Sequence, residues 1–493
     1  MNNIQKKCVL FMDGSLFFRA ILWFFDGLTK FFQGSLVVRL FTADFDTERL
    51  KHSFFVRNIE KILNFPPKFG DCSVSLKGVL GGSRIIKSTV GVLGFDLPAY
   101  ILIAVVLLTP FLPTIPAVGL IAVAFFLALF FYTFKLELID LPLMFFMVVS
   151  LISAIMSVAA SYSIPIAFLS IAIMLSCILS KTAIFTRSRL DLCLAAFVVA
   201  TLGTGFVAIF QMYTGYLNPA WIDAELFAGF MGVRVFSTFG NPNIYAAYLL
   251  LAIPIAAVCI LYAKNTWFKL FAFGTTIVLL GALAATYSRG AYVALALSVM
   301  VFMLLIERRL IVLFVAGLAV APFLLPATIL ARVLSIVNLT DSSTMYRIAI
   351  WQSSLRMIGD FWMAGIGQGA AAYNAIYPFY AFSAVVAQHT HNLFLQIFIE
   401  TGLVGLLVFV AILACFFRTQ FSFIRRAADV RLKLLSQAMV SAVVGFLALG
   451  MFDYPFHNYR VMLTFYLFLG IASCVVNIGS AEYEKNKGDA DNH

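Results

Sequence analysis

Long runs of mostly apolar residues fill this chain, and they restrict its fold more than any other feature of the sequence. A helix needs about 20 such residues to cross the hydrocarbon core of a membrane. The runs lie at about 98–112, 115–134, 141–160, 164–180, 190–214, 243–263, 267–286, 290–306, 309–327, 392–417, 434–452 and 459–477. Because 62% of the residues are hydrophobic and only 12% are charged, the sequence predicts an all-α polytopic membrane protein with about 12 transmembrane helices. Prolines between the first two runs leave open whether these form two helices or one broken re-entrant element.

The positions of Lys and Arg predict how these helices are oriented. If the amino terminus is cytoplasmic, the inner loops hold Lys135, Lys181, Arg187, Arg189, Lys264, Lys269, Arg308, Arg309, Arg418, Arg425, Arg426, Arg431 and Lys433. The outer loops then hold only Arg234, Arg289, Arg332, Arg347, Arg356 and Arg460. Because Lys and Arg concentrate in cytoplasmic loops, this asymmetry predicts that both termini are cytoplasmic. It also accounts for the net charge of +11, so no nucleic-acid partner is expected.

Three regions are expected along the chain. Residues 1–95 mix charged and aromatic residues in an amphipathic pattern, which is typical of a cytoplasmic segment that lies on the membrane surface or packs on a partner. Residues 96–480 form the transmembrane domain, with a long, partly helical extracytoplasmic loop at about 328–391 between helices 9 and 10. Residues 481–493 form a polar cytoplasmic tail, which we expect to be disordered.

The seven cysteines show no CxxC pair and no Cys/His spacing of the kind that binds metals. They are Cys8, Cys72, Cys177, Cys193, Cys259, Cys415 and Cys474. We therefore expect free thiols, with neither a structural disulfide nor a zinc site.

The unusual polar residues all fall at the predicted outer ends of the helices. They are Arg234, Arg289, Arg347, His389, His391, Asp453, His457 and Arg460. Separated arginines together with histidines, at the outer surface of a membrane, suit the recognition of an anionic headgroup and acid/base chemistry.

Some of these positions also have simpler explanations. Asn241-Pro242-Asn243 is a typical helix start, with Asn241 as the N-cap and proline at the first helical position. Arg289 could simply extend along its helix to reach the membrane interface. A single histidine such as His457 is more often a hydrogen-bonded interfacial residue than a catalyst.

The stretch from Gln388 to Gly402 joins the long loop to an apolar run. Asn392, Gln396 and Glu400 follow one another at i, i+4 and i+8, so they line one face of a helix and are expected to brace it. His389 and His391 are two residues apart and would point to different sides of a helix. Because no carboxylate lies nearby in the sequence to complete a set of ligands, no metal is expected there.

Two groups of glycines have structural explanations. The segment Gly365-Ile366-Gly367-Gln368-Gly369 follows no buried strand, so we interpret it as a turn in which glycine allows a close backbone approach, not as a dinucleotide loop. Gly402 and Gly405 are expected to allow tight packing between helices.

Taken together, these stretches resemble the O-antigen ligase and O-antigen polymerase superfamily of membrane glycosyltransferases. The resemblance covers about residues 200–450, and the ordered set of pieces is more specific than any one of them. The pieces are Phe236-Ser-Thr-Phe-Gly-Asn-Pro-Asn243, Tyr287-Ser-Arg-Gly-Ala291, Arg347 with Trp351, Gly365-Ile-Gly-Gln-Gly369, His389-Thr-His-Asn392 and Glu400-Thr-Gly402.

The resemblance implies the transfer of a glycan from a polyprenyl-diphosphate carrier, held in membrane lipid, to an acceptor of unknown identity. The reaction would take place on the outer face of the cytoplasmic membrane, without a metal or another cofactor. By motif position, Arg234 and Arg289 would hold the lipid diphosphate, and His391 would deprotonate or orient the acceptor hydroxyl. The secondary candidates are His389, Arg347, Asn243 and Glu400.

Other functions stay open on the sequence alone. A ligase moves the glycan to an envelope acceptor, whereas a polymerase joins two carrier-linked glycans; the Ser-Arg-Gly and His-Thr-His-Asn pieces favour the ligase. A secondary transporter of a small anion such as bicarbonate is a second class, although few ionisable residues fall at the membrane midplane. A non-catalytic scaffold, docked through the amino-terminal segment, is a third.

Overall fold

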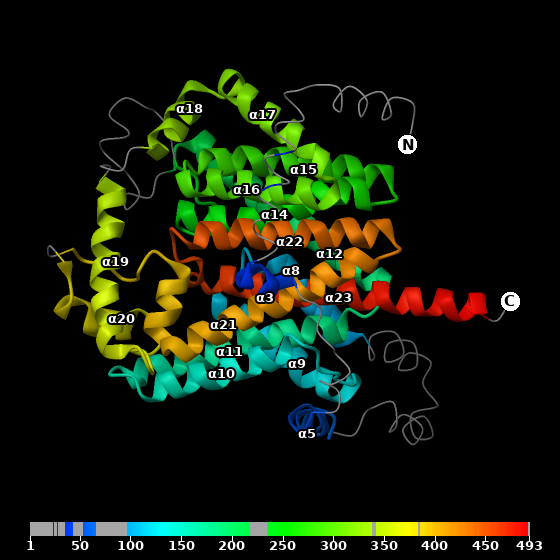
Figure 1. Cartoon of the computed structure of the whole chain (residues 1–493), viewed down its shortest axis with the longest axis horizontal. Coiled ribbons are helices and arrows are strands. Elements are labelled where there is room, and N and C mark those ends of the chain that lie inside the picture. Colours follow the sequence, from blue (N-terminus) through cyan, green and yellow to red (C-terminus); the bar gives the residue numbers. More distant parts are fainter. Residues whose placement is uncertain are drawn as a thin grey trace.

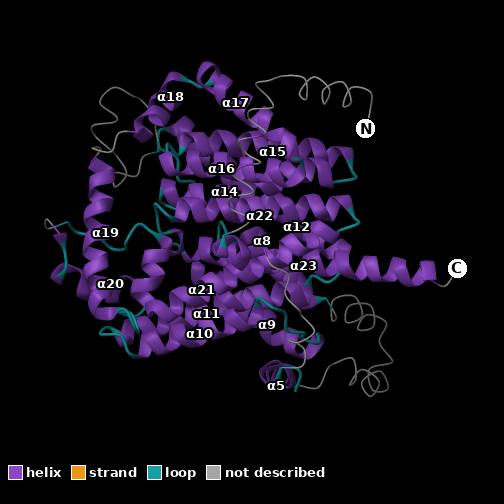
Figure 2. Ribbon diagram, in the orientation of Figure 1, coloured by secondary structure: helices purple, strands orange, loops and turns teal. Residues whose placement is uncertain are grey.

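The structure is a computed structural model, and it describes residues 23, 27, 35–42, 53–65, 96–216, 234–337, 342–382 and 385–491. Within these ranges the chain forms helices and connecting loops, with no strand (Figure 2). The prediction of an all-α fold is therefore confirmed. Most of the amino-terminal segment falls outside the described residues, apart from two short helices, α3 (Leu36–Thr42) and α5 (Phe54–Leu63).

The helices of the membrane domain begin and end close to the predicted apolar runs. They are α8 (Leu97–Leu108), α9 (Thr114–Phe131), α10 (Asp140–Ile155), α11 (Ala160–Ala183), α12 (Arg187–Thr214), α14 (Pro242–Tyr262), α15 (Thr266–Ala285), α16 (Arg289–Ile306), α17 (Ile311–Leu324), α21 (Leu393–Arg426), α22 (Val430–Gly450) and α23 (Tyr459–Asp491). In the described part of the chain, nine helices are long and apolar enough to cross a membrane, and α8 and α10 are shorter apolar helices. The chain is thus a polytopic membrane protein, while the larger total of spans stays a prediction.

The first two apolar runs form two helices that are joined by a short turn. Helices α8 and α9 pack against each other. The turn between them is closed by Phe111 N and Leu112 N, which both donate to Leu108 O at 2.9 Å. Pro113 stands at the N-cap of α9, where its missing N–H breaks no helical hydrogen bond.

The long helices lie side by side, with their axes running across Figure 1. The starts of α14, α16, α21 and α23 meet at the end drawn on the left, beside α19 and α20. We call this end, with its connecting segments 234–241, 286–288, 385–392 and 451–458, the histidine end. The other end of the bundle, where α23 finishes, is called the opposite end.

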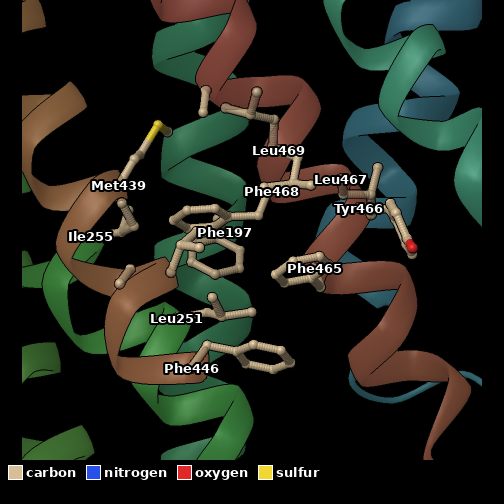
Figure 3. Close-up of a cluster of buried hydrophobic side chains, with 14 of the residues drawn as sticks. Phe197, Leu251, Ile255, Met439, Phe446, Phe465, Tyr466, Leu467, Phe468 and Leu469 are labelled. Carbon is tan, nitrogen blue, oxygen red and sulfur yellow. The ribbon is translucent and has the colours of Figure 1, made fainter. Parts of the chain in front are cut away.

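Apolar side chains fill the interior, and α14 is its most enclosed helix. It contacts α12, α15, α16, α22 and α23, so most of its side chains are buried. The ring of Phe446 stacks on that of Phe465 with the centroids 4.9 Å apart, and Figure 3 shows both rings near Leu251 of α14. This packing fixes the helix ends that carry the polar motifs.

The long loop between α17 and α21 is largely helical, as predicted. It contains α18 (Ala327–Leu334), α19 (Ser342–Phe361) and α20 (Ala370–Ile376). Helix α19 packs against α21, and the indole Nε1 of Trp351 donates to Thr390 O at 2.9 Å. A small apolar cluster that includes Ile350, Met357 and Tyr373 also packs this loop. The last part of the loop is therefore held against the start of α21.

The expectation of a disordered tail is wrong, because residues 481–491 continue α23. Glu and Lys are good helix formers, and a preceding helix removes the cost of nucleation. Glu482 also pairs with Arg187 at 3.5 Å. This ion pair connects the extension of α23 to the start of α12, at the opposite end of the bundle.

Candidate functional site

Three residues other than glycine have a positive φ in the described part of the chain, and each lies in one of the polar motifs. Ser237 (φ 48°) precedes α14, Tyr287 (φ 50°) precedes α16, and His391 (φ 50°) precedes α21. This conformation costs an L-residue about 1–2 kcal/mol, and backbone strain clusters at functional sites. Backbone strain and motif positions therefore mark the same region, the histidine end.

The start of α21 is fixed by hydrogen bonds on both sides of His391. Asn392 is the N-cap, and its Oδ1 accepts from Leu395 N at 3.0 Å. Thr390 N donates to Oε1 of Gln396 at 2.8 Å, and its hydroxyl donates to Asn392 O at 2.8 Å. His391 is thus held between fixed neighbours in a left-handed conformation, which directs its ring toward the segment between α22 and α23.

In that segment lies a carboxylate that pairs with the histidine. Nδ1 of His391 is 3.1 Å from Oδ1 of Asp453, and this oxygen also accepts from Tyr454 N at 2.8 Å. The ring centroid of His389 is 4.2 Å from that of His391 and 4.7 Å from that of His457. We call these three histidines and Asp453 the histidine cluster.

The electrostatics of the cluster follow from burial and from these contacts. Burial and the neighbouring His391 lower the pKa of His389 to about 3, so its ring is neutral near pH 7. Burial also lowers the pKa of His457. For Asp453 burial raises the pKa, but the hydrogen bond from His391 and the charges of His391 and Arg347 outweigh it and hold this pKa well below its usual range. Asp453 is therefore ionised and orients His391.

The geometry corrects two expectations about His389 and His391. The two side chains do not point to different sides of a helix, and a carboxylate does lie beside them. Since His391 is not helical, one ligand atom from each of His389, His391 and Asp453 lies within 4.8 Å of the others, a spacing that could hold a metal ion. Arg347 opposes that use, because its positive charge acts on both His389 and Asp453. A hydrogen-bonded His–Asp pair is the arrangement that the contacts show.

The arginines of the earlier motifs meet at the turn before α16. Arg234 Nε donates to Thr286 O at 3.0 Å, and its terminal nitrogen donates to Oδ1 of Asn243 at 3.2 Å. Arg289 begins α16, and its terminal nitrogen donates to Ser335 O at 3.1 Å. Arg332 Nε donates to Tyr287 O at 3.1 Å. We call Arg234, Arg289 and Arg332 the arginine turn; three guanidinium groups there suit a diphosphate.

The predicted cap before α14 is confirmed. Asn241 Oδ1 accepts from Asn243 N at 2.8 Å and from Ile244 N at 3.4 Å, and Pro242 is the first helical residue. The same short segment thus begins a helix and supplies Asn243 as a partner of Arg234. The structural and functional explanations of this motif are compatible.

Arg347 belongs with the histidines and not with the other two predicted arginines. Its terminal nitrogen donates to Ser343 Oγ at 2.9 Å within α19, and its buried Nε has no hydrogen-bond partner in the structure. Its charge contributes to the lowered pKa values of Asp453 and His389.

Glu400 lies one turn below Gln396 on the face that the sequence predicted. Its Oε1 accepts from Gln396 Nε2 at 3.0 Å and from Gly369 N at 3.3 Å, and its Oε2 accepts from the Tyr454 hydroxyl at 3.4 Å. Both side chains are buried. The bracing role predicted for this stripe is observed, and Glu400 also contacts the glycine loop.

The glycine loop at 365–369 meets α21 backbone to backbone, as predicted. Ile366 N donates to Ile399 O at 2.8 Å and Gly367 N donates to Glu400 O at 3.1 Å. The prediction that Gly402 allows packing between helices is wrong, because this residue approaches the turn that follows α19, at Met363 and Ala364. Its φ of 71° breaks α21, and a Cβ there would lie 2.1 Å from Met363 O. Only glycine fits such an approach.

A cavity of about 330 Å³ opens beneath the histidine cluster. Its polar lining includes Gln368, His389, Gln396, Glu400 and His457, and its apolar lining comes from α10, α11, η6 (Pro455–His457) and α23. His389 is among its lining residues, and His391 is not. Arg234 and Arg289 do not line it either.

The predicted site residues thus fall into three neighbouring groups at one end of the bundle. Arg234, Asn243 and Arg289 gather at the arginine turn; His389, His391 and Arg347 gather around the histidine cluster; and Glu400 lines the cavity. The sequence did not single out Arg332 or Gln368, and it named Asp453 without pairing it with His391. The only signal for that pair was the location of both residues at predicted outer ends of helices.

These features define a helical membrane protein with a cationic and histidine-bearing site at one end. A search of curated proteins gave no match. Residues 274–410 match the Wzy_C family model, described as O-antigen ligase, and this match confirms the expected resemblance. The matched stretch contains Arg289, Arg347, His391 and Glu400, whereas Arg234 and Asp453 lie outside it.

Proposed function

We propose that this protein is an O-antigen ligase-like glycosyltransferase, which moves a glycan from a polyprenyl-diphosphate carrier to a cell-envelope acceptor. The reaction would take place at the histidine end, on the outer face of the cytoplasmic membrane, with both termini cytoplasmic and without a metal. The observation that carries this proposal is the hydrogen bond between His391 and Asp453, next to the family domain's other polar motifs. It supplies an oriented base for an acceptor hydroxyl.

The proposed step is a single displacement. The acceptor oxygen attacks the anomeric carbon of the carrier-linked sugar, and the bond from that carbon to the diphosphate oxygen breaks. The hydroxyl proton passes to His391: with Nδ1–H donated to Asp453, Nε2 carries the lone pair that accepts it. The leaving diphosphate takes the bonding electrons, and Arg234 and Arg289 of the arginine turn stabilise its charge.

The test uses purified protein in lipid nanodiscs with a polyprenyl-diphosphate glycan and a panel of acceptors. We expect release of the carrier diphosphate, coupled to glycan transfer. His391→Ala should lower turnover by about 10²–10⁴-fold, the usual contribution of a general base, and Arg289→Ala by a comparable factor. Arg356→Gln is the matched control, because Arg356 of α19 contacts the ring of Phe382 outside the three groups. Wild-type turnover in both site variants would contradict the assignment.

Asp453→Asn tests the role of this carboxylate, and a chelator distinguishes orientation of His391 from metal binding. The amide keeps the size of the side chain but cannot stabilise a protonated His391, so turnover should fall by at least about tenfold. A chelator should leave wild-type turnover unchanged. If a chelator removes activity and a divalent cation restores it, His389, His391 and Asp453 bind a metal ion and do not act as a His–Asp pair.

The acceptor panel also separates the ligase from the polymerase. Transfer to a lipid or other envelope acceptor supports the ligase, whereas transfer only to a second carrier-linked glycan makes the protein a polymerase. Proteoliposomes test the transporter alternative. Saturable anion uptake that lipid-linked glycan does not affect would contradict both the ligase and the polymerase function and would support a transporter.

A further inference from the structure

The cavity beneath the histidine cluster contains polar atoms that the protein itself does not satisfy. Three buried groups that line it have no hydrogen-bond partner in the structure: Oε1 of Gln368, Nδ1 of His389 and the hydroxyl of Tyr466. Gln368 is 6% exposed and Tyr466 is fully buried. A buried polar group without a partner costs about 1–3 kcal/mol. Three such groups around one cavity indicate that their partner is a ligand.

Two of these groups come from different elements that line the cavity. Gln368 belongs to the glycine loop, and Tyr466 belongs to α23, which Figure 3 shows carrying its hydroxyl away from the ring of Phe465 and the other labelled apolar side chains. Tyr466 therefore supplies a donor, and Gln368 supplies an acceptor. Glu400, which already accepts from Gln396 and Gly369, keeps further lone pairs on its carboxylate.

The glycine loop and the break in α21 hold the cavity wall in a fixed backbone conformation. Gly365, Gly367 and Gly369 all have positive φ, and the loop bonds to the carbonyl oxygens of Ile399 and Glu400 where α21 breaks at Gly402. The Ser153 hydroxyl donates to the same Glu400 carbonyl at 2.5 Å. Gln368 and Glu400 are thus held in fixed positions on the cavity wall, as a binding site requires.

The remaining lining decides which ligand chemistry fits. None of the residues that line this cavity is Lys or Arg, and the lowered pKa values of His389 and His457 keep both rings neutral near pH 7. A diphosphate would therefore find no cation here. The apolar part of the wall includes Phe146, Ile166 and Met462, which suits the C–H face of a sugar ring.

We propose that this cavity is a subsite for a neutral, hydroxylated pyranose ring, with Gln368, Tyr466 and Glu400 as its hydrogen-bonding residues. The volume of about 330 Å³ lies at the lower end of the range of about 300–1,000 Å³ for small-ligand sites, as expected for a single ring. The subsite deepens the proposed function and rests on it for the role of the ring, which is either the sugar nearest the carrier diphosphate or a sugar of the acceptor. An acidic sugar would find no Lys or Arg among the lining residues, so uronates are disfavoured.

Two variants test the subsite without disturbing the fold. Gln368→Met and Tyr466→Phe keep the approximate size of the side chain and remove the unpartnered Oε1 and hydroxyl oxygen, so neither should lower the unfolding temperature. Tyr248→Phe is the matched control, since the Tyr248 hydroxyl is equally buried and unpartnered but lies away from this cavity, on α14.

The first readout is steady-state kinetics of the full chain in nanodiscs. Each site variant should raise one KM by about three- to tenfold, the contribution of one hydrogen bond, while Tyr248→Phe changes neither KM. A rise in the KM of the carrier-linked glycan assigns the ring to the donor, and a rise in the KM of the acceptor assigns it to the acceptor. Unchanged values in both variants would overturn the subsite while the proposed function stands.

The second readout does not need turnover. Saturation-transfer NMR with methyl glucoside, methyl N-acetylglucosaminide and methyl glucuronide should show binding of the neutral rings, weakened about three- to tenfold in the two site variants. If the wild-type protein binds these rings but transfers no glycan, the proposed function fails and the subsite stands. If no turnover occurs and no variant alters pyranoside binding, the cavity holds only solvent and the subsite is overturned.

Discussion

The two ends of the bundle treat charge differently. At the opposite end, basic side chains pair with carboxylates: Lys181 with Asp140 and, at 3.6 Å, with Glu137, and Arg187 with Asp429 at 2.9 Å. At the histidine end, each of four arginines donates to at least one main-chain oxygen: Arg234 to Thr286, Arg289 to Ser335, Arg332 to Tyr287, and Arg460 to Pro110 and Thr238.

The difference has a physical meaning. A carboxylate cancels the charge of its partner, and when the pair is buried it locks two helices together. A carbonyl oxygen orients a guanidinium group without cancelling its charge. The buried pair of the opposite end therefore joins two helices, whereas the hydrogen bonds at the histidine end orient the guanidinium groups. Three changes, taken from the largest expected effect to the smallest, test this distinction.

The largest effect on stability is expected at the buried pair of the opposite end. Asp140→Asn leaves the buried charge of Lys181 without its closest partner and should lower the free energy of unfolding by about 3–5 kcal/mol. Unfolding in mixed detergent measures it. Asp140→Asn combined with Lys181→Met removes both charges and should recover much of the loss. A stable single variant would show that this end does not depend on the pair.

An intermediate effect is expected when the histidine end is acidified. The pKa of His389 falls from 6.5 to about 3 on folding, so between these values the unfolded chain binds more protons than the folded chain. The contribution of His389 to stability then decreases as the pH falls below about 6.5, by on the order of 1–2 kcal/mol at pH 5.

His389→Gln should flatten this dependence. Unfolding temperatures of both proteins between pH 4.5 and 7.5 measure it, a window above the range in which the lowered pKa of Asp453 contributes. Equal slopes for the two proteins would mean that His389 is not buried in its neutral form.

The smallest effect is expected at the half-exposed pair of the opposite end. The side chains of Arg187 and Asp429 are 26% and 33% exposed, and pairs of this kind contribute less than about 1 kcal/mol. Arg187→Gln keeps the cap of α22, because Asp429 still accepts from Arg431 N and Leu432 N. A decrease of more than about 2 kcal/mol in the free energy of unfolding would mean that the Arg187–Asp429 pair stabilises the fold in the way of the buried Lys181–Asp140 pair.

Much of the fold follows from the sequence because a membrane leaves little choice. The apolar runs predicted the helices within a few residues, since backbone groups in hydrocarbon must be satisfied within a helix. The cap at Asn241 and the glycine turn at 365–369 were also predictable, because each depends on residues close together in the chain. The helical tail after Ala481 was missed because composition alone ignores the helix that precedes it.

The candidate site was predictable only in part. The motifs identified Arg234, Arg289, His389 and His391 as polar residues at one predicted face. They did not reveal that His391 adopts φ 50° and therefore faces Asp453, 62 residues further along the chain. Sequence spacing assumes a helix, and at this point the chain is not helical.

By itself, the sequence determined that this is a helical membrane protein, where its helices lie, and which end carries unusual polar residues. Hydropathy and the hydrogen bonds of single helices are local, so they can be deduced from neighbouring residues. The tertiary structure alone decided that Asp453 orients His391, that Arg332 joins the arginine turn, and that Gln368 and Tyr466 face one cavity. These groups are distant in the chain and meet only because helix packing brings the ends of different helices together.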